Sequence, residues 1–334
     1  MMEEWNYSIE RYSEEKSKEW DEFVLQNSVN GTFLQTRRFL NYHPQNRFQD
    51  ASFIIYDKKG HIAAVVPANH IKTKEGFQLA SHQGSTFGGI VIGMKHYKAY
   101  KVIEIIQCLE SKLKELGYEE VQYKITSDIF SREDSDLLEY ALYYCGYPSY
   151  EELNSYIDFS RYKENILGNF EQGKRTNVNN CLKAGVKVKE LAHKGEIAEF
   201  YRILCHTLEK YDRKPVHTLE ELIDFKENRL CDEIGFYGAF LDDKMIAGSM
   251  MFYFNNVNVA HTQYLCALHE YDKLSPMTFM YYSMIKEMKE KNYDKLSFGI
   301  TSEHLGKELN FGLTKSKEAF GSKHSISRIY YKKI

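Results

Sequence analysis

The sequence has little of what marks a metalloprotein, a disulfide-rich secreted protein or a membrane protein. Its six cysteines occur singly, and it contains no C-x-x-C pair. Neither metal-ligand spacing nor a disulfide framework is indicated, so we expect reduced thiols and no bound metal. The N-terminal segment lacks the apolar core of a signal peptide, and no apolar run approaches the ~20 residues of a membrane helix. We therefore expect a soluble, cytoplasmic protein.

Positive charge is not in excess either. Lys and Arg total 44 against 47 Asp and Glu, which gives a net charge of −3. Tight, non-specific binding to nucleic acid needs a basic surface that displaces counterions. The charge balance therefore disfavours a nucleic-acid-binding protein, and it disfavours a tRNA partner for the same reason.

The length and composition are those of a folded protein with more than one core. Apolar residues make up 43% and charged residues 27% of the 334 residues, an ordinary globular balance. A chain of this length exceeds what one hydrophobic core usually organises. We therefore expect two domains.

The chain repeats itself at a distance of 175 residues. GYEEVQYKITSD begins at Gly117, and NYDKLSFGITSE begins at Asn292. Each follows a segment with apolar residues at helical spacing, 97–116 in one half and 278–291 in the other. Gly117 and Asn292 are good C-terminal cap residues. We predict a helix, a cap and a short strand in each half.

A second shared unit precedes each predicted helix. Residues 51–71 and 235–254 both have the pattern of a strand, an Asp-containing turn and a strand, which predicts a hairpin. Another extended segment follows each hairpin, at 77–93 and at 257–267. The halves thus share one α/β order: helices, hairpin, third strand, amphipathic helix, strand, then a further helix and strand. We place the boundary at 160, which gives domains 1–160 and 161–334.

This order of elements resembles the GNAT acyltransferase fold, present twice, as in the Fem-type peptidyl- and acyltransferases. Three stretches are similar to that family: GTFLQTRRF at Gly31–Phe39, the basic segment at Lys174–Val188, and the closing segment at Leu296–Gly321. The resemblance implies an α/β (α+β) fold, with a mixed, mostly antiparallel sheet flanked by helices in each domain. It also implies that the second domain binds the donor and carries out catalysis.

The resemblance and the residue pattern together predict three catalytic residues: Lys317, His261 and Ser302. Lys317 matches a family lysine near the reacting carbonyl or the donor's phosphates; the alternative is an exposed helical lysine. His261 could take a proton from an attacking amine, or be a hydrogen-bonded interior residue. Ser302 follows the repeated strand, where α/β sheets bind ligands, but it could equally begin a helix, as could Ser127 in the first copy.

Acyl-CoA is the predicted co-substrate. In a GNAT-like domain the third strand separates from the next one, which frees backbone N–H groups for the pantetheine arm, and the following helix N-terminus suits a phosphate. The alternative for Ser275 and Pro276 is a simple helix cap. The usual Q/R-x-x-G-x-G/A loop of acyl-CoA-dependent members is absent here. The predicted cofactor contacts are Gln263, Tyr264, Leu274, Ser275, Met277 and Thr278.

Basic and glycine-rich segments are the predicted substrate contacts. An arginine pair could bind a pyrophosphate, although neighbouring residues cannot share a helix face. Close glycines let the backbone approach a ligand, or form a bulged strand. A basic stretch between Gln172 and Lys189 could dock a phosphate-bearing partner, or be a solvated helix face. The predicted residues are Arg37, Arg38, Thr86, Phe87, Lys174 and Arg175.

Three functions remain open on the sequence. The first is an N-acyltransferase that uses acyl-CoA and an amine of an amino-sugar, amino-acid or peptide acceptor. The second is an aminoacyl-tRNA-dependent peptidyltransferase acting on a cell-wall precursor. The third is a non-catalytic binding protein with degenerate GNAT domains.

Overall fold

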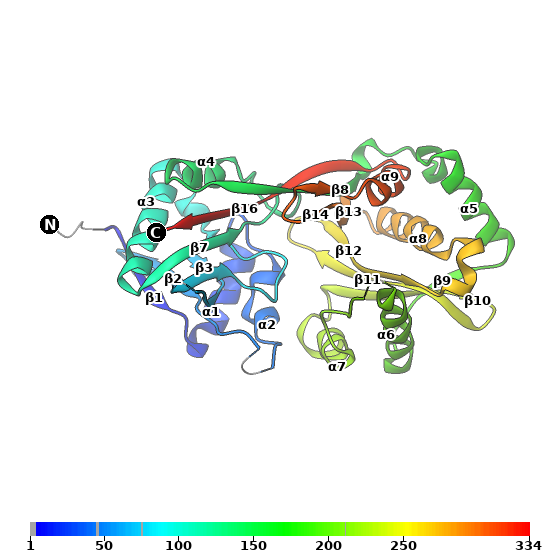
Figure 1. The fold of residues 1–334 in the computed structure, drawn as a ribbon, viewed down its shortest axis with the longest axis horizontal. Coiled ribbons are helices and arrows are strands. Elements are labelled where there is room, and N and C mark those ends of the chain that lie inside the picture. The colour runs from blue at the N-terminus through cyan, green and yellow to red at the C-terminus, as the bar shows by residue number, and fades with distance from the viewer. Residues whose placement is uncertain (1–4, 45–46, 75, 211) are drawn as a thin grey trace. The chain divides into compact units, whose positions relative to one another are not determined.

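The computed structural model describes residues 5–44, 47–74, 76–210 and 212–334, and it divides the chain into two compact units (Figure 1). Unit 1 consists of Met1–Glu152 and Ile326–Ile334, and unit 2 is Leu153–Ser325. The first four residues of the acidic N-terminal segment lie outside the described residues.

The strands of unit 1 form two groups, which separate at Pro67. One group has the order β1-β2-β3-β6, and the other has the order β4-β5-β7-β16. Pro67 lies between β3 and β4, and because proline has no N–H it cannot continue a strand ladder. The strands are β1 (Tyr7–Arg11), β2 (Phe53–Asp57), β3 (Ile62–Val66), β4 (Ala68–Lys72), β5 (Phe77–Ser81), β6 (Val91–Ile92), β7 (Tyr118–Lys124) and β16 (Lys323–Lys333). The helices are α1 (Ser17–Glu22), α2 (Arg37–Leu40), α3 (Ala99–Glu115) and α4 (Asp136–Tyr144).

Unit 2 is built on a sheet with the order β8-β13-β12-β11-β10-β9, in which only the β12–β13 pair is parallel. Helix α6 covers one face of this sheet and α8 the other (Figure 1). The strands are β8 (Ser149–Asp158), β9 (Lys187–Glu190), β10 (Ile234–Leu241), β11 (Lys244–Phe254), β12 (Val259–Ala267) and β13 (Lys295–Ile300), with a separate small pair β14 (Ser302–Glu303) and β15 (Glu308–Leu309). The helices are α5 (Gln172–Lys183), α6 (Lys194–Glu209), α7 (Leu219–Asp224), α8 (Pro276–Glu290) and α9 (Phe311–Glu318).

The predicted repeat is confirmed element by element. Hairpin β2–β3 corresponds to β10–β11, helix α3 to α8, and strand β7 to β13. Gly117 and Asn292 both end their helices in the left-handed conformation, at φ 78° and 59°, as expected for C-terminal caps. The mixed, mostly antiparallel sheets flanked by helices confirm the expected fold class.

The last strand of each half pairs in the unit formed mostly by the other half. Strand β8, which follows α4, pairs with β13 through residues 154–158. Strand β16, which follows α9, pairs with β7 through residues 329–333. The predicted ranges 1–160 and 161–334 therefore differ from the compact units, because residues 326–334 complete the sheet of unit 1.

Adjacent tyrosines on β16 provide a test of this strand exchange. Tyr330 is 5% exposed and belongs to the core of unit 1, whereas Tyr331 is 45% exposed. We expect Tyr330→Ala to lower the free energy of unfolding of unit 1 by about 3 to 4 kcal/mol, and Tyr331→Ala to change it by less than about 1 kcal/mol. Both tryptophans, Trp5 and Trp20, lie in unit 1, so their fluorescence during denaturant unfolding reports on that unit. Equal effects of the two substitutions would contradict the assignment of β16 to this core.

Candidate functional site

The parallel pair of unit 2 separates after three residue pairs. Strand β12 pairs with β13 from Val259↔Lys295 to His261↔Ser297. Beyond this point both strands carry an irregularity: the β11–β12 register shifts at Gln263, and the β13–β8 register shifts at Phe298. Bulges bend strands and end pairing, and they are frequent beside active sites. We call the gap that opens beyond His261 and Ser297 the split.

Polar groups meet where the split begins. The Ser297 Oγ accepts a hydrogen bond from the Gly299 N–H at 3.2 Å and lies 3.0 Å from the His261 Nδ1. Gly299 has φ +73°, and a Cβ atom there would lie 3.3 Å from the His261 Cε1. This position therefore favours glycine both for its backbone conformation and for its closeness to the imidazole. The sequence analysis did not identify Ser297 or Gly299 as part of the site.

Lys317, on α9, reaches the same end of β13. Its side chain is buried, and its Nζ donates to the carbonyl oxygens of Phe298 (2.7 Å), Gly299 (3.2 Å) and Ile300 (3.0 Å). The alternative of an exposed helical lysine is therefore wrong. An ammonium group has three N–H donors, and all three are directed at the protein backbone.

The electrostatics at the split keep His261 neutral. Burial, and then the positive charge of Lys317, lower the pKa of His261 to about 4. A base with this pKa accepts a proton poorly at neutral pH, since an effective general base has a pKa near the working pH. The structure thus brings His261 and Lys317 together, as predicted, but weakens the case for His261 as a general base.

Ser302 has a different role from a helix start. Its Oγ accepts a hydrogen bond from the Leu153 N–H at 3.1 Å, and the residue belongs to β14. In the first copy, the Ser127 Oγ donates to the Ile326 carbonyl at 3.3 Å. Both serines therefore hold an exchanged strand, β8 in one copy and β16 in the other. The expectation of a helix start at Ser302 is wrong.

The start of α8 lies where it was predicted, but in an unusual conformation. Ser275 precedes Pro276 in the left-handed region at φ 58°, and its carbonyl accepts from the Thr278 N–H at 3.0 Å. Within the described part of the chain, the Ser275 hydroxyl makes no capping hydrogen bond. Thr278 is buried and Met277 half-buried. Pro276 is buried and has no N–H, and the Phe279 N–H also donates to the Ser275 carbonyl, at 3.3 Å. The first turn of α8 therefore satisfies most of its own N–H groups.

Helix α5 supports this region from one side. The Cys181 Sγ donates to the Leu274 carbonyl at 3.0 Å, and the Lys174 Nζ donates to the Ser316 Oγ at 2.9 Å. The Lys174 Nζ also lies 4.6 Å from the centre of the Phe320 ring, and burial lowers the pKa of this lysine. Lys174 thus contacts α9, whereas Arg175 is exposed.

Tyr264 contacts His217, a residue that was not predicted from the sequence. Its hydroxyl lies 2.8 Å from the Nδ1 of His217, which is buried, and burial raises the pKa of Tyr264 to about 12. Thr218 and Glu221 form a capping box at the start of α7, so the sequence signal at this point marks only a helix start. Tyr264 fixes the segment before α7 to β12, while Gln263 lies half-buried at the bulge.

The predicted arginine pair of unit 1 diverges, as neighbouring helical residues must. Arg37 is buried: its guanidinium lies 3.4 Å from the Tyr12 ring centre and 4.2 Å from that of Trp20, and it pairs with Asp50. Arg38 is half-buried, and its backbone N–H donates to Asp21 at 3.1 Å. Arg37 therefore supports the interior of unit 1.

Unit 1 has the matching parallel pair, β5 and β7, but its own backbone fills the space where they end. The Gly88 N–H donates to the Lys124 carbonyl at 3.0 Å, and the Ser81 Oγ accepts from the N–H groups of Gly89 (2.8 Å) and Lys124 (2.7 Å). A Cβ atom at Gly88 would lie 2.7 Å from that of Ser81. The glycines of this segment thus allow close packing within the protein.

The two predicted substrate contacts in this segment, Thr86 and Phe87, differ in solvent exposure. Phe87 is buried with its ring centre 5.2 Å from that of Phe130, and Thr86 is exposed. Phe87 is therefore a packing residue of unit 1, and only Thr86 faces solvent.

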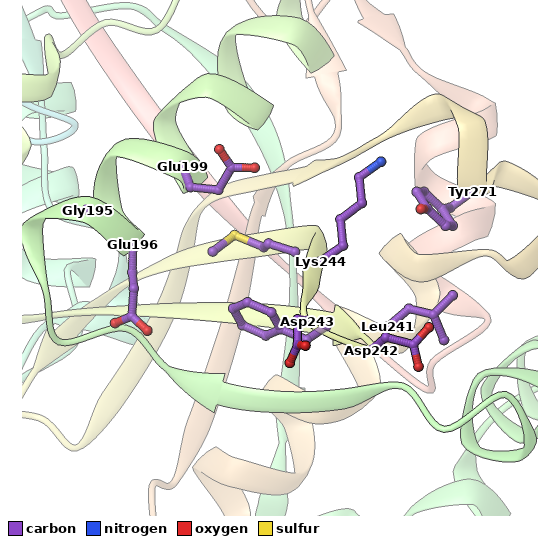
Figure 2. Close-up of a pocket in the computed structure, with 10 residues that line it drawn as sticks. Gly195, Glu196, Glu199, Leu241, Asp242, Asp243, Lys244 and Tyr271 are labelled. Atoms are coloured by element: carbon purple, nitrogen blue, oxygen red, sulfur yellow. The ribbon is translucent and has the colours of Figure 1, made fainter.

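A hollow of about 750 Å³ lies where the turn between β10 and β11 meets α6 (Figure 2). This hollow is remote from the split. Its turn lies six residues along β11 from the register shift at Met250, a distance of about 20 Å. Four acidic side chains line the hollow and would repel a phosphate-bearing donor: Glu196, Glu199, Asp242 and Asp243.

The neutrality of His261 gives a pH prediction. Because its folded pKa is about 4 and that of an unfolded histidine about 6.5, the unfolded chain binds more protons between these values. The stabilising contribution is present above pH 6.5 and is lost as the pH falls towards 4. We expect the ring signals of His261 in NMR spectra to stay constant from pH 8 to pH 5.5, and His261→Gln to reduce the acid loss of stability. A ring titration near pH 6.5 would contradict this.

The described residues contain neither a membrane-spanning helix nor a cluster of metal-ligating side chains. No helix there is both long and apolar enough to cross a bilayer. No group of three or more His, Cys, Asp or Glu side chains in the same residues is arranged to hold a metal ion.

Comparison with known proteins connects this geometry to a family. Residues 174–306, within unit 2, match the family model of the acetyltransferase (GNAT) domain. No curated protein sequence matches the chain. The crystal structure of FemX has a TM-score of 0.69 at 12% identity, with 97% of this chain and 96% of FemX covered.

Two further solved structures share the fold over almost their whole length. L-PGS from Bacillus licheniformis has a TM-score of 0.63 at 11% identity, with 96% and 93% of the chains covered. A tandem GNAT protein from the clavulanic acid biosynthesis pathway has a TM-score of 0.56 at 8% identity, with 98% of each chain covered. At these identities the likeness shows the fold alone. Residues 174–306 of unit 2 thus match the GNAT acetyltransferase domain, and the whole chain shares the tandem fold of FemX and the tandem GNAT protein.

Proposed function

We propose that the protein transfers an acyl group from acyl-CoA to an amine of an amino-sugar, amino-acid or peptide acceptor, with the donor bound in unit 2. The observation that supports this most is the split between β12 and β13. Beyond His261, β12 continues to Ala267 and pairs with β11 on its other side. This part of β12 is about 20 Å long, and at its far end the Thr207 hydroxyl bonds to the N–H and the carbonyl of Ala267. An extended ligand with amide groups can add to such an edge as a strand would, and the pantetheine arm of CoA is a ligand of this kind.

The start of α8 suits the donor's pyrophosphate. The helix has 15 residues and begins nine residues after β12 ends. The positive end of its dipole favours an anion. The corresponding gap in unit 1 is filled by Gly88 and Gly89. Unit 2 is therefore the proposed donor-binding unit, and a CoA donor would place the reaction in the cytoplasm.

In the proposed reaction, the amine nitrogen attacks the thioester carbonyl carbon, the C–N bond forms, and the C–S bond breaks. Backbone N–H groups of β12 that face the split would stabilise the oxyanion, which is usually the largest catalytic contribution. The low pKa of His261 makes it a weak proton acceptor, so the amine would lose its proton to solvent.

A second candidate is an aminoacyl-tRNA donor. The basic stretch predicted from the sequence is exposed at Arg175, Lys183, Lys187 and Lys189, and an exposed basic surface can bind nucleic-acid phosphates. The fold likeness to FemX is compatible with either donor.

Calorimetric titration with acetyl-CoA tests the first proposal. At 100 times its dissociation constant, acetyl-CoA should stabilise the protein by about 2.7 kcal/mol. We expect Met277→Glu, in the first turn of α8, to weaken acetyl-CoA binding at least tenfold, because its charge repels the pyrophosphate. The same charge favours the helix itself, but Met277 also packs against the core of unit 2, so the thermal unfolding of the variant is measured beside its binding. Ser283→Glu, later in the same helix, is the matched control and should bind as the wild type does.

The other functions predict different outcomes. Binding of aminoacyl-tRNA without binding of acetyl-CoA would replace the first proposal by the second. Binding of neither donor would leave the non-catalytic function. Release of free CoA thiol in the presence of an amine would establish transfer.

A further inference from the structure

Three consecutive carbonyl groups at the end of β13 converge on one ammonium group. Lys317 binds the oxygens of Phe298, Gly299 and Ile300 at 2.7–3.2 Å. In a regular strand, successive carbonyls point to opposite sides, towards the two neighbouring strands. They converge here because the chain turns at Gly299, where φ is +73°. The turn at Gly299 brings the three carbonyls together, and the Lys317 ammonium binds them in this arrangement.

The ammonium is enclosed by the protein. Lys317 is only 3% exposed, and burial lowers its pKa to about 8. The group is therefore charged at neutral pH, and its three N–H donors match the three carbonyls. Any direct hydrogen bond to a ligand would require one of these bonds to break, and at Phe298 this would leave a buried carbonyl unsatisfied.

Helix α9, which carries Lys317, is itself held in place. Ser316 accepts a hydrogen bond from the Lys174 Nζ at 2.9 Å. Phe320 packs against Phe170 and Tyr281, with ring centres 5.0 and 4.9 Å apart. The Lys317 ammonium is thus presented to β13 by a fixed helix.

We propose that Lys317 is a positioning residue, which holds the end of β13 turned away from β12 and so keeps the split open to the donor's pantetheine arm. It acts through the carbonyls of Phe298, Gly299 and Ile300, and it contacts neither the donor's phosphates nor its reacting carbonyl. This inference rests on the proposed function, because it names the part of the donor that the split receives. It assigns Lys317 a role different from the direct contact expected from the sequence.

The test compares Lys317→Met with Lys315→Met, an exposed lysine two residues earlier on the same helix. Each variant is titrated with acetyl-CoA, with S-acetyl-pantetheine and with pantetheine. We expect Lys317→Met to weaken all three at least tenfold and by the same factor, because all three share the arm that enters the split. Lys315→Met should bind all three as the wild type does. If Lys317 contacted the phosphates, only acetyl-CoA binding would weaken, and if it contacted the reacting carbonyl, pantetheine binding would be unchanged; either result overturns the proposal.

A second readout does not depend on a donor. Removal of the Lys317 charge should raise the pKa of His261 in an NMR titration, and it should speed amide hydrogen exchange at residues 299–301. Lys315→Met should change neither. If Lys317→Met does not fold, Gly299→Ala replaces it, because this variant keeps the lysine but displaces the carbonyls, and it should speed the same exchange.

The two readouts separate the proposals. If the wild type binds none of the three compounds, the proposed function fails. The positioning role then stands if exchange at residues 299–301 and the titration of His261 respond to Lys317→Met. It is overturned if both remain as in the wild type.

Discussion

The parallel pairing of β12 with β13 is the constraint on which the rest of the site depends. A parallel ladder continues only while both strands keep their register. Here the register of both strands shifts within two residues of the last pair, at Gln263 and at Phe298. An irregularity in only one of the two strands would leave the other strand straight, and pairing could resume beyond it. The two irregularities together turn a continuous sheet into one with an internal edge.

The two sides of this edge differ in how their backbone groups are satisfied. On β13, the carbonyls of Phe298, Gly299 and Ile300 are bound by the Lys317 ammonium. On β12, the bonds to β11 occupy one side, and the Thr207 hydroxyl bonds to the N–H and the carbonyl of Ala267 at the end of the strand. Buried backbone groups need hydrogen-bond partners, so the side of β12 that faces the split is where a ligand gains the most. Burial lowers the pKa of His261, and the positive charge of the fixed ammonium lowers it further, so the imidazole stays neutral.

The two copies of the fold use the same feature in opposite ways. In unit 1, Gly88 and Gly89 bring a loop between the ends of β5 and β7, and the Ser81 hydroxyl binds N–H groups from both sides. In unit 2, Ser297 binds the N–H of Gly299 within its own strand and approaches His261 on the neighbouring one. One copy thus closes its sheet with its own backbone, and the other leaves an edge open.

Much of the fold could be predicted because its signals are local. The hairpin turns, the period of the apolar residues in α3 and α8, and the left-handed caps at Gly117 and Asn292 depend on residues a few positions apart. Their recurrence 175 residues later determined the duplication. The site was only partly predictable: Lys317 and His261 were identified, but Ser297, Gly299 and His217 were not.

What only the tertiary structure decided depends on contacts between residues distant in sequence. Lys315 and Lys317 look alike in the sequence, yet one is exposed and the other is buried on carbonyls 17 to 19 residues away. Ser302 has the sequence pattern of a helix start, but its partner, Leu153, lies 149 residues away. Arg37 and Phe87 had the pattern of ligand contacts and became packing residues. The local sequence pattern indicates which faces are apolar and where turns occur. The hydrogen-bond partner of each polar group is instead determined by how segments distant in the sequence pack together.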